Sequence, residues 1–172
     1  FATFAALLPG FLEEWALSKT EGGWLGGIFF AGYVGAVLVL VSLTDRVAPK
    51  RVYLSAMVLT ALSGVGFALF AGGFWSALFW RIVAGIGLAG TYMPGMKMLG
   101  DRLSGRAQSR AVAFYASHFS IGWALSFFLA GEIAGALGWR WAFALCAAGP
   151  VLSMLLVGFA VPADDPESFG KD

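Results

Sequence analysis

The stretch "LVSLTDRVAPKRVYL", residues 40 to 54, places four charged side chains and a proline between two long apolar segments. Each flanking segment runs for about 20 residues, which is the length that an α-helix needs to cross ~30 Å of hydrocarbon. A charged interruption of this kind is typical of a short connection between two membrane-spanning helices. The fold therefore depends on how many such segments the chain contains and on which side their connections lie.

Composition indicates an all-α integral membrane protein. Of the 172 residues, 59% are hydrophobic and 12% are charged, and the mean hydropathy is +0.81; a soluble domain has about 25% charged residues. Backbone groups in lipid must be satisfied within the segment that crosses it, which favours helices. The net charge of +1 is too small to indicate a nucleic-acid partner. Cys146 lies in an apolar run and is interpreted as a small buried side chain.

The apolar segments predict six transmembrane helices. Five full spans are expected, over residues 22–44, 52–72, 74–98, 109–137 and 140–161. The stretch "FATFAALLPGFL", residues 1–12, is shorter than a span and is interpreted as the end of a truncated first helix. Residues 1–161 are therefore expected to form one helix bundle. The polar stretch "PADDPESFGKD", residues 162–172, is expected to begin a cytoplasmic linker.

The basic residues of the connections predict the orientation. The connections after the second, fourth and sixth helices contain Arg46, Lys50, Arg51, Lys97, Arg102, Arg106, Arg110 and Lys171. The opposite connections contain only Lys19 and Arg140. Because cytoplasmic loops carry the excess of Lys and Arg, the first group is expected to face the cytoplasm. The chain is predicted to be a multi-pass protein of the cell membrane, or of the inner membrane in a Gram-negative bacterium.

Three Arg, Lys, His, Asp or Glu side chains lie well inside the predicted spans, at least five residues from their ends: Arg81, His118 and Glu132. Arg81 and Glu132 lie at nearly the same predicted depth near the outer ends of antiparallel helices. Intramembrane charges are expensive and usually paired, so we expect an Arg81–Glu132 pair that acts as a structural tie or in coupling; snorkelling of both to the interface is the alternative. His118, near mid-membrane, is a candidate to relay a proton or bind an anion, or else a hydrogen-bonded packing residue.

Two stripes of small residues recur at every fourth position. They consist of Gly23, Gly27, Ala31 and Gly35 in one helix and of Gly122, Ser126, Ala130 and Ala134 in another. Small residues let helix backbones approach closely. The stripes therefore predict either helix packing or smooth surfaces that slide, as alternating access requires.

Three motifs resemble those of the major facilitator superfamily. The stretch "VSLTDRVAPKRV", residues 41–52, is similar to the loop signature G-x-x-x-D-R-x-G-R-R of that family, matched by Asp45, Arg46, Lys50 and Arg51. Val41 replaces the leading glycine, and the basic pair is displaced by one residue. "WRIVAGIGLAG", residues 80–90, resembles an R-x-x-x-G-x-G pattern of the fourth helix, and "GWRWAF", residues 138–143, resembles the opening of the sixth.

The resemblance implies a fold and a function. The fold is half of a twelve-helix transporter, with six helices built as 3+3 inverted repeats. The function is secondary active transport of a small solute by alternating access, proton-coupled as a symporter or antiporter; a facilitator or a non-transporting scaffold of the same fold is the alternative. The implied partners are the solute, the lipid bilayer and the carboxy-terminal six-helix half of the same chain.

The resemblance also implies roles for residues. Asp45, with Arg46, Lys50 and Arg51, would form the cytoplasmic gate. The first and fourth helices of the family line the substrate cavity, so Arg81, Leu88 and Tyr92 of the fourth helix are expected to line it. Tyr33, Met93 and Tyr115 lie at a similar central depth and are expected beside them. One histidine and one cysteine provide no nucleophile–base pair and no metal cluster, so neither an enzyme, a cofactor nor a metal is predicted.

Overall fold

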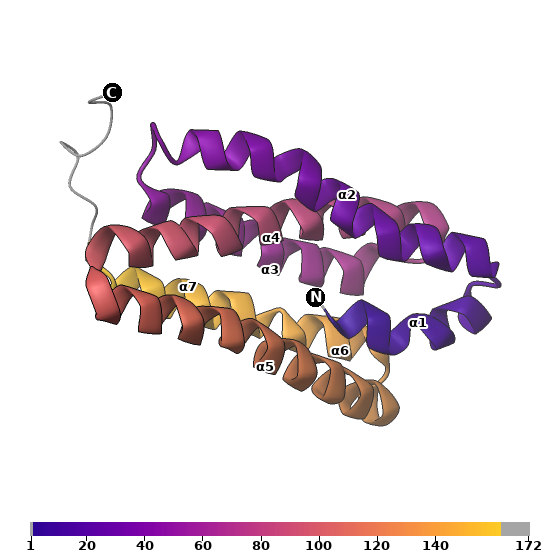
Figure 1. The fold of residues 1–172 in the computed structure, drawn as a ribbon. Coiled ribbons are helices and arrows are strands. Elements are labelled where there is room, and N and C mark those ends of the chain that lie inside the picture. The colour runs from indigo at the N-terminus through magenta and orange to yellow at the C-terminus, as the bar shows by residue number, and fades with distance from the viewer. Residues whose placement is uncertain (1, 163–172) are drawn as a thin grey trace.

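The computed structural model describes residues 2–162, which form helices joined by short connections (Figure 1). The helices are α1 (Ala2–Glu14), α2 (Lys19–Leu43), α3 (Pro49–Phe70), α4 (Phe74–Arg102), α5 (Gly105–Leu137), α6 (Trp139–Cys146) and α7 (Ala148–Ala160). Five segments are long and apolar enough to cross a membrane, with α6 and α7 together forming the last. The predicted all-helical membrane fold is confirmed. Residues 163–172, where the linker is expected, lie outside the described part.

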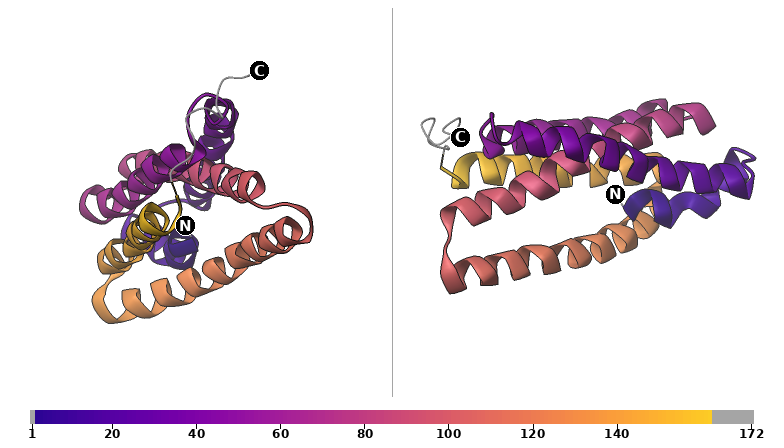
Figure 2. Two further views of the ribbon diagram at one scale, coloured as in Figure 1. Left: turned by 90° about the vertical axis from the view of Figure 1, so that its left-hand side faces the viewer. Right: turned by 45° about the horizontal axis from the view of Figure 1, so that its top comes forward.

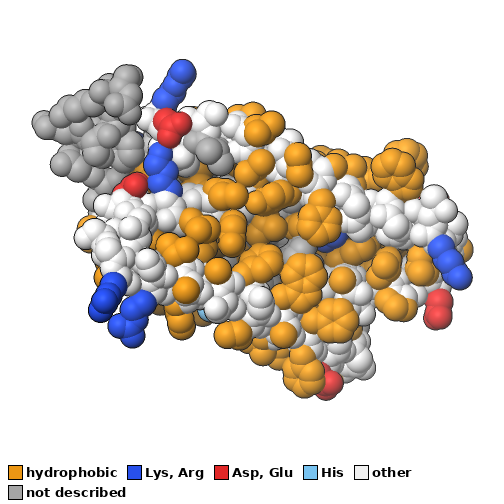
Figure 3. Space-filling model, in the orientation of Figure 1, with side chains coloured by type: hydrophobic (Ala, Val, Ile, Leu, Met, Phe, Trp, Pro, Cys, Tyr) orange, Lys and Arg blue, Asp and Glu red, His pale blue; other side chains and the backbone are white. Residues whose placement is uncertain are grey.

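The long helices run side by side, and their connections gather at two ends of the bundle (Figures 1 and 2). Helix α4 packs closely against both α2 and α3, whereas α5 lies along another side with α1 and α6. The α2–α3 and α4–α5 connections and the end of α7 share one end, which we call the basic end. Lys and Arg side chains gather there, and apolar side chains cover much of the visible middle of the bundle (Figure 3).

Glycines place α4 between its two neighbours. A Cβ atom on Gly85 would overlap the carbonyl oxygen of Phe29 in α2, and one on Gly87 would overlap Thr60 in α3. From the α2 side, Gly32 faces the backbone of Ile82 in the same way. Lipid tails are as apolar as the helix surfaces, so close van der Waals contact is what holds such helices together. The R-x-x-x-G-x-G pattern thus has a packing role on both faces of α4.

The last span is interrupted at Ala147, between α6 and α7. Pro150 stands in the first turn of α7, where its missing N–H and its ring are incompatible with a continuous bond to the carbonyl of Cys146. The predicted span over 140–161 is present as the apolar segment Trp139–Ala160, with a break in its helix at Ala147. The cause was present in the sequence as "CAAGP", residues 146–150.

An aromatic cluster closes the end opposite the basic one. The rings of Phe67 and Phe143 stack at 4.1 Å between centroids, and Phe11 packs edge-on against Trp139 at 5.2 Å. Trp139 also donates a 2.8 Å hydrogen bond from Nε1 to Oε2 of Glu14. Aromatic pairs of this geometry contribute about 0.5–1.5 kcal/mol each beyond their buried area. The "GWRWAF" stretch thus joins α6 to α1 and α3.

The side chain of Arg140, from the same stretch, caps the C-terminal end of helix α3. Its Nη1 donates to the carbonyl of Ala68 at 2.7 Å and to that of Leu69 at 3.4 Å, and its Nη2 donates to Ala71 at 3.3 Å. The last carbonyls of a helix have no partner within it, and a cation there also opposes the negative end of the helix dipole. Arg140 therefore satisfies an exposed helix end.

The two small-residue stripes differ in their surroundings. On α5, Ala130 is buried and the hydroxyl oxygen of Ser126 lies 3.4 Å from that of Thr3 in α1, whereas Gly122 has open space where a Cβ would stand. On α2, Gly23, Gly27 and Gly35 have open space where a Cβ would stand. The middle of the α5 stripe therefore packs against α1, and the glycines of the α2 stripe form an uncovered surface in the described part of the chain.

Candidate functional site

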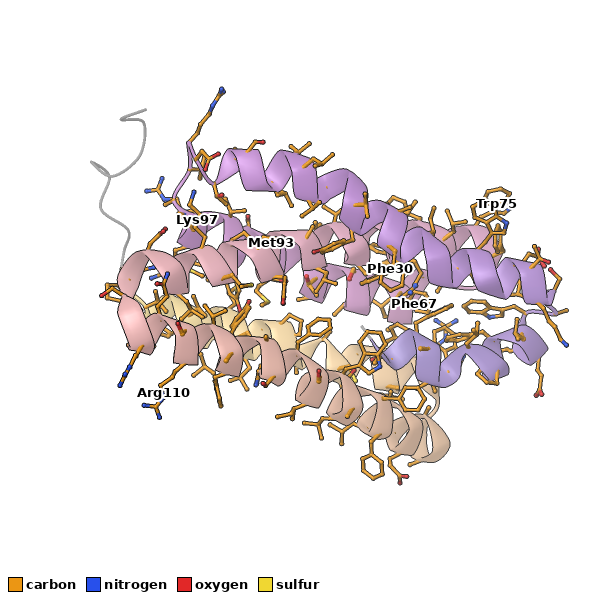
Figure 4. All side chains as sticks on the ribbon, viewed as in Figure 1. Phe30, Phe67, Trp75, Met93, Lys97 and Arg110 are labelled. Atoms are coloured by element: carbon orange, nitrogen blue, oxygen red, sulfur yellow. The ribbon has the colours of Figure 1, made fainter. Side chains whose placement is uncertain are left out.

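Asp45 of the loop signature forms an ion pair within the bundle. Its Oδ1 lies 2.8 Å from Nζ of Lys97, which also donates to the carbonyl of Thr44 at 3.0 Å. Lys97 comes from the last third of α4 and points toward the α2–α3 connection (Figure 4). The pair joins the basic ends of α2 and α4. The Asp45 side chain is 70% exposed, so the pair is open to solvent and contributes about 0–1 kcal/mol to stability.

Two other cations at the basic end bind the carbonyls at the end of α7. Lys50 donates from Nζ to Gly158 at 3.0 Å and also to Val161. Arg102 donates from Nη2 to the carbonyl of Pro162 at 3.1 Å. Of the four predicted gate residues, Asp45 and Lys50 therefore have contacts inside this bundle, whereas Arg46 and Arg51 are exposed.

Arg81 lies inside the bundle, and its side chain is held by α1 and α2. It is 6% exposed, and its Nε donates to the carbonyl of Leu25 at 3.0 Å. Its Cζ lies 4.3 Å from the ring centroid of Phe4 and 4.6 Å from that of Phe29, so the guanidinium makes a cation–π contact with each ring. These contacts replace the expected ion pair as the means of holding the charge.

The predicted Arg81–Glu132 pair is not formed. Glu132 is exposed on α5, and among residues 2–162 the ion pair that the structure contains is Lys97–Asp45. The two side chains lie on different faces: Arg81 points into the bundle, whereas Glu132 is exposed. Sequence position gives depth along a helix more reliably than it gives rotation about it, because small residues allow several packing faces.

His118 also lies on the exposed face of α5. Its ring stacks on that of Phe114 at 6.5 Å between centroids, and the same helix surface carries Phe128 and Glu132. Within residues 2–162, the contact described for His118 is this stack on Phe114. The face is uncovered by residues 2–162.

A cavity of about 320 Å³ lies around Arg81, mainly between α3, α4 and the last span. Apolar groups dominate its lining, with Phe29, Met57, Trp80 and Phe143 among them. It also contains six hydroxyl groups, those of Thr3, Thr60, Ser63, Thr91, Ser126 and Ser153. An apolar cavity with a few converging polar groups is the usual form of a small-molecule site.

A second cavity, of about 250 Å³, is lined by aromatic side chains from α2, α4 and α5. Its lining residues are Phe30, Tyr33, Leu88, Tyr92, Phe119 and Trp123. Leu88 lines both cavities, so they are neighbours along α4. Three predicted lining residues, Tyr33, Leu88 and Tyr92, thus come together here, and Arg81 belongs to the adjoining cavity.

Met93 and Tyr115 lie beside this site. Met93 is 39% exposed and lines neither cavity. The ring of Tyr115 lies 5.8 Å from that of Tyr92, and its hydroxyl donates to the carbonyls of Thr91 at 3.3 Å and Tyr92 at 3.4 Å. Tyr115 therefore links α5 to α4 near Pro94, where the helix backbone bonding is interrupted.

Sequence reasoning missed the α5 contribution to the aromatic cavity. Phe119 and Trp123 follow Tyr115 at intervals of four in "YASHFSIGW", residues 115–123, a spacing that places three aromatic rings on one helix face. This spacing could have predicted the aromatic face of α5 from the sequence alone. The two rings that flank Arg81, Phe4 and Phe29, had no comparable signal, because an isolated phenylalanine is common throughout these spans.

Comparison with known proteins agrees with this architecture. A helical membrane bundle with two adjoining cavities fits a transporter fold, and the family model of the Major Facilitator Superfamily matches residues 1–171. The chain belongs to this superfamily. Its five membrane-spanning segments, together with the shorter helix α1, are consistent with half of the twelve-helix fold expected from the resemblance, and it is a multi-pass membrane protein.

Relatives in this superfamily are named as transporters of small molecules. The chain is 31% identical to a probable 4-methylmuconolactone transporter of Cupriavidus pinatubonensis over 81% of its own length and 33% of the relative. It is 24% identical to the niacin transporter NiaP of Acinetobacter baylyi, covering 94% of the chain and 36% of NiaP. It is also 24% identical to the 4-hydroxybenzoate transporter PcaK of that organism, over 94% and 35%. The chain spans about a third of these relatives' length.

Proposed function

We propose that this bundle is part of a secondary active transporter that moves a small ring-containing organic solute by alternating access. The observation that carries the proposal is the pair of adjoining cavities on either side of Leu88 inside an otherwise apolar bundle. The larger contains a buried arginine and hydroxyl groups, and the smaller is aromatic. Relatives named for niacin and 4-hydroxybenzoate support a small cyclic solute, since such rings match the size and lining of these cavities.

Proton coupling is part of the proposal. Support comes from three ionisable groups placed within membrane spans, Arg81, His118 and Glu132, where such groups are rare and usually functional. His118 and Glu132 share the exposed face of α5, so they are accessible to a partner surface or to solvent in a cavity. We assign them the coupling role and Arg81 a role beside the solute.

The gate role of Asp45 is likewise proposed. Asp45 pairs with Lys97 while remaining largely exposed, so the pair is weak enough to break during a conformational cycle. In the proposed cycle Asp45 exchanges Lys97 for a partner in the carboxy-terminal half of the transporter. Lys50 stays on the end of α7 in both states, because its acceptors are backbone carbonyls of this bundle.

The test of transport is uptake into proteoliposomes by the full-length protein. Radiolabelled nicotinate, 4-hydroxybenzoate and unrelated solutes such as glucose and alanine are offered with and without an inward proton gradient. Uptake of a cyclic solute that the gradient accelerates supports the proposal. Uptake at the same rate with and without the gradient identifies a facilitator. Absence of uptake for every solute tested favours a non-transporting protein of the same fold.

Two groups of variants separate coupling from gating. His118→Gln and Glu132→Gln are expected to abolish the response to the gradient while leaving exchange of solute across the membrane, which requires no net proton movement. Asp45→Asn is expected to slow both processes, and Lys97→Gln to affect them less. If Asp45→Asn and Lys97→Gln are equally harmful and their double variant is no worse, the internal pair itself is the working contact and the exchange of partners is excluded.

A further inference from the structure

Arg81 has hydrogen-bond donors that residues 2–162 do not use. A guanidinium has five N–H donors, and Nε uses its single one on the carbonyl of Leu25. The terminal amino groups have no hydrogen-bond acceptor among residues 2–162, although Arg81 is only 6% exposed. The rings of Phe4 and Phe29 lie against the guanidinium, and Arg81 lines the cavity. No fully enclosed side-chain nitrogen or oxygen among residues 2–162 lacks a hydrogen-bond partner, so the terminal nitrogens of Arg81 reach open space, where an acceptor can bind.

The surrounding hydroxyl groups do not supply that acceptor in the way a carboxylate would. Those of Thr60, Ser63 and Thr91 donate to carbonyls of their own helices. Thr3 and Ser126 are hydrogen-bonded to each other at 3.4 Å, so one of their two hydroxyl hydrogens is free to donate to a third group. These hydroxyl oxygens can still accept a hydrogen bond, but they carry no charge to neutralise the guanidinium of Arg81. Among residues 2–162, no acidic side chain lines the cavity.

The charge and shape of the cavity define the ligand. One positive charge without an acidic neighbour is neutralised by a monoanion, whereas a dianion would bring a second, uncompensated charge into the membrane interior. The planar edge of a guanidinium matches the two oxygens of a carboxylate. Phe29, Met57 and Phe143 provide an apolar wall for the rest of the molecule. A volume of about 320 Å³ suits a compact molecule.

We infer that the Arg81 cavity binds the carboxylate of a small monoanionic organic solute through the terminal amino groups of Arg81. The Thr3–Ser126 hydroxyl pair donates to the same carboxylate, and the apolar body of the solute lies toward Met57 or, past Leu88, toward the aromatic cavity. This inference rests on the proposed transport function for its physiological meaning, and it makes a statement about binding that is testable without transport.

Arg140 provides a matched control. It too lies beside an aromatic ring, with Cζ 4.5 Å from the centroid of Trp139. Its terminal amino groups, however, donate to the carbonyls that end α3. Arg140 and Arg81 therefore share a side chain and a cation–π contact but differ in whether donors remain for a ligand.

The experiment is equilibrium dialysis of the purified full-length protein against radiolabelled benzoate, with benzamide as a neutral competitor of nearly the same shape. We expect benzoate to bind and benzamide not to displace it. Arg81→Gln should weaken benzoate binding by about 10-fold to 100-fold, the factor associated with losing hydrogen bonds to a charged group. Arg140→Gln should leave the affinity unchanged, and Arg81→Lys should give an intermediate affinity, because it keeps the charge without the planar edge.

Cys146 locates the bound molecule, because it lines the same cavity. Benzoate is expected to slow modification of Cys146 by methyl methanethiosulfonate, followed by mass spectrometry of the peptide that contains it, and benzamide is not. Absence of benzoate binding, equal displacement by benzamide, or equal losses in Arg81→Gln and Arg140→Gln would overturn the inference. If a variant fails to fold, the comparison of benzoate with benzamide on the wild-type protein still tests whether the cavity binds a carboxylate.

The outcomes separate this inference from the proposed function. Benzoate binding with the expected dependence on Arg81, but no uptake of any solute, would retain the carboxylate site and reject transport. Uptake of neutral solutes without benzoate binding would retain transport and reject the site.

Discussion

Helices α4 and α5 are similar as sequences and different as parts of the molecule. Both are long, apolar and rich in small residues, and both carry an ionisable group within the membrane. Yet α4 has ten buried residues and α5 has one, Ala130. Gly85 and Gly87 of α4 lie against backbone atoms of α2 and α3, whereas Gly122, Gly131 and Gly135 of α5 face open space. Hydropathy therefore places a helix in the membrane, and the direction of its glycines decides whether it lies at the centre.

The largest effect is expected where a side chain is added between α4 and α2. In Gly85→Ala the new methyl group overlaps the carbonyl of Phe29, and backbone atoms of a packed helix have little room to move. We expect a loss of stability of about 1–3 kcal/mol or more, as overpacking gives. The measurement is the midpoint of thermal unfolding of the full-length protein in detergent.

Gly122→Ala is the matched control on α5. No atom lies within 4 Å of the position that its Cβ would occupy, and alanine is a better helix former than glycine by about 1 kcal/mol. This variant should unfold at the same temperature as the wild type or higher. Equal destabilisation by the two substitutions would show that the contrast between α4 and α5 does not hold in the full-length protein.

A moderate effect is expected at the contact that joins the two helices. Tyr115→Phe removes the hydroxyl that donates to the carbonyls of Thr91 and Tyr92, at a cost of about 0.5–1.5 kcal/mol. The midpoint of thermal unfolding should fall, and hydrogen exchange of the α4 amides around Pro94 should become faster. Tyr33→Phe, which removes a hydroxyl with no hydrogen bond to residues 2–162, should change neither measurement.

The smallest effect is expected on the exposed face of α5. His118→Gln removes a side chain whose described contact is a stack on Phe114, so stability should stay within about 0.5 kcal/mol of the wild type, as for other surface changes. The midpoint of unfolding in detergent is again the measurement. A large decrease would mean that this face is packed in the complete protein, and its proposed coupling role would then need a test separate from folding.

Much of the fold followed from the sequence. Apolar runs of bilayer length predicted each membrane helix, because the bilayer fixes their length and prevents an unbonded backbone. Helix ends were less predictable: α4 extends to Arg102 and α5 begins at Gly105, since helices continue beyond the hydrocarbon as far as their polar ends allow. The break at Ala147 had its signal in Pro150.

The candidate site was predictable in its depth and only partly in its composition. Tyr33, Leu88 and Tyr92 line one cavity. Sequence position gave the central depth of all three residues, and the spacing of four placed Leu88 and Tyr92 on one face of α4. The partner of Arg81 was not predictable, because the charge is held by a carbonyl and two rings, Phe4 and Phe29, which no charge pattern marks. Lys97 was recognised as a basic residue, yet its pairing with Asp45 required the three-dimensional arrangement of two connections.

The end of α7 has a mechanical consequence. Lys50, in the first turn of α3, and Arg102, at the end of α4, both hold carbonyls between Gly158 and Pro162. A pull on the chain beyond Pro162 therefore does not load α7 alone. The force divides among three helices at one end of the bundle, and through α4 it reaches the segment that carries Arg81 and Leu88. Force applied to the chain after Pro162 is therefore transmitted to α4, the helix that lines both cavities.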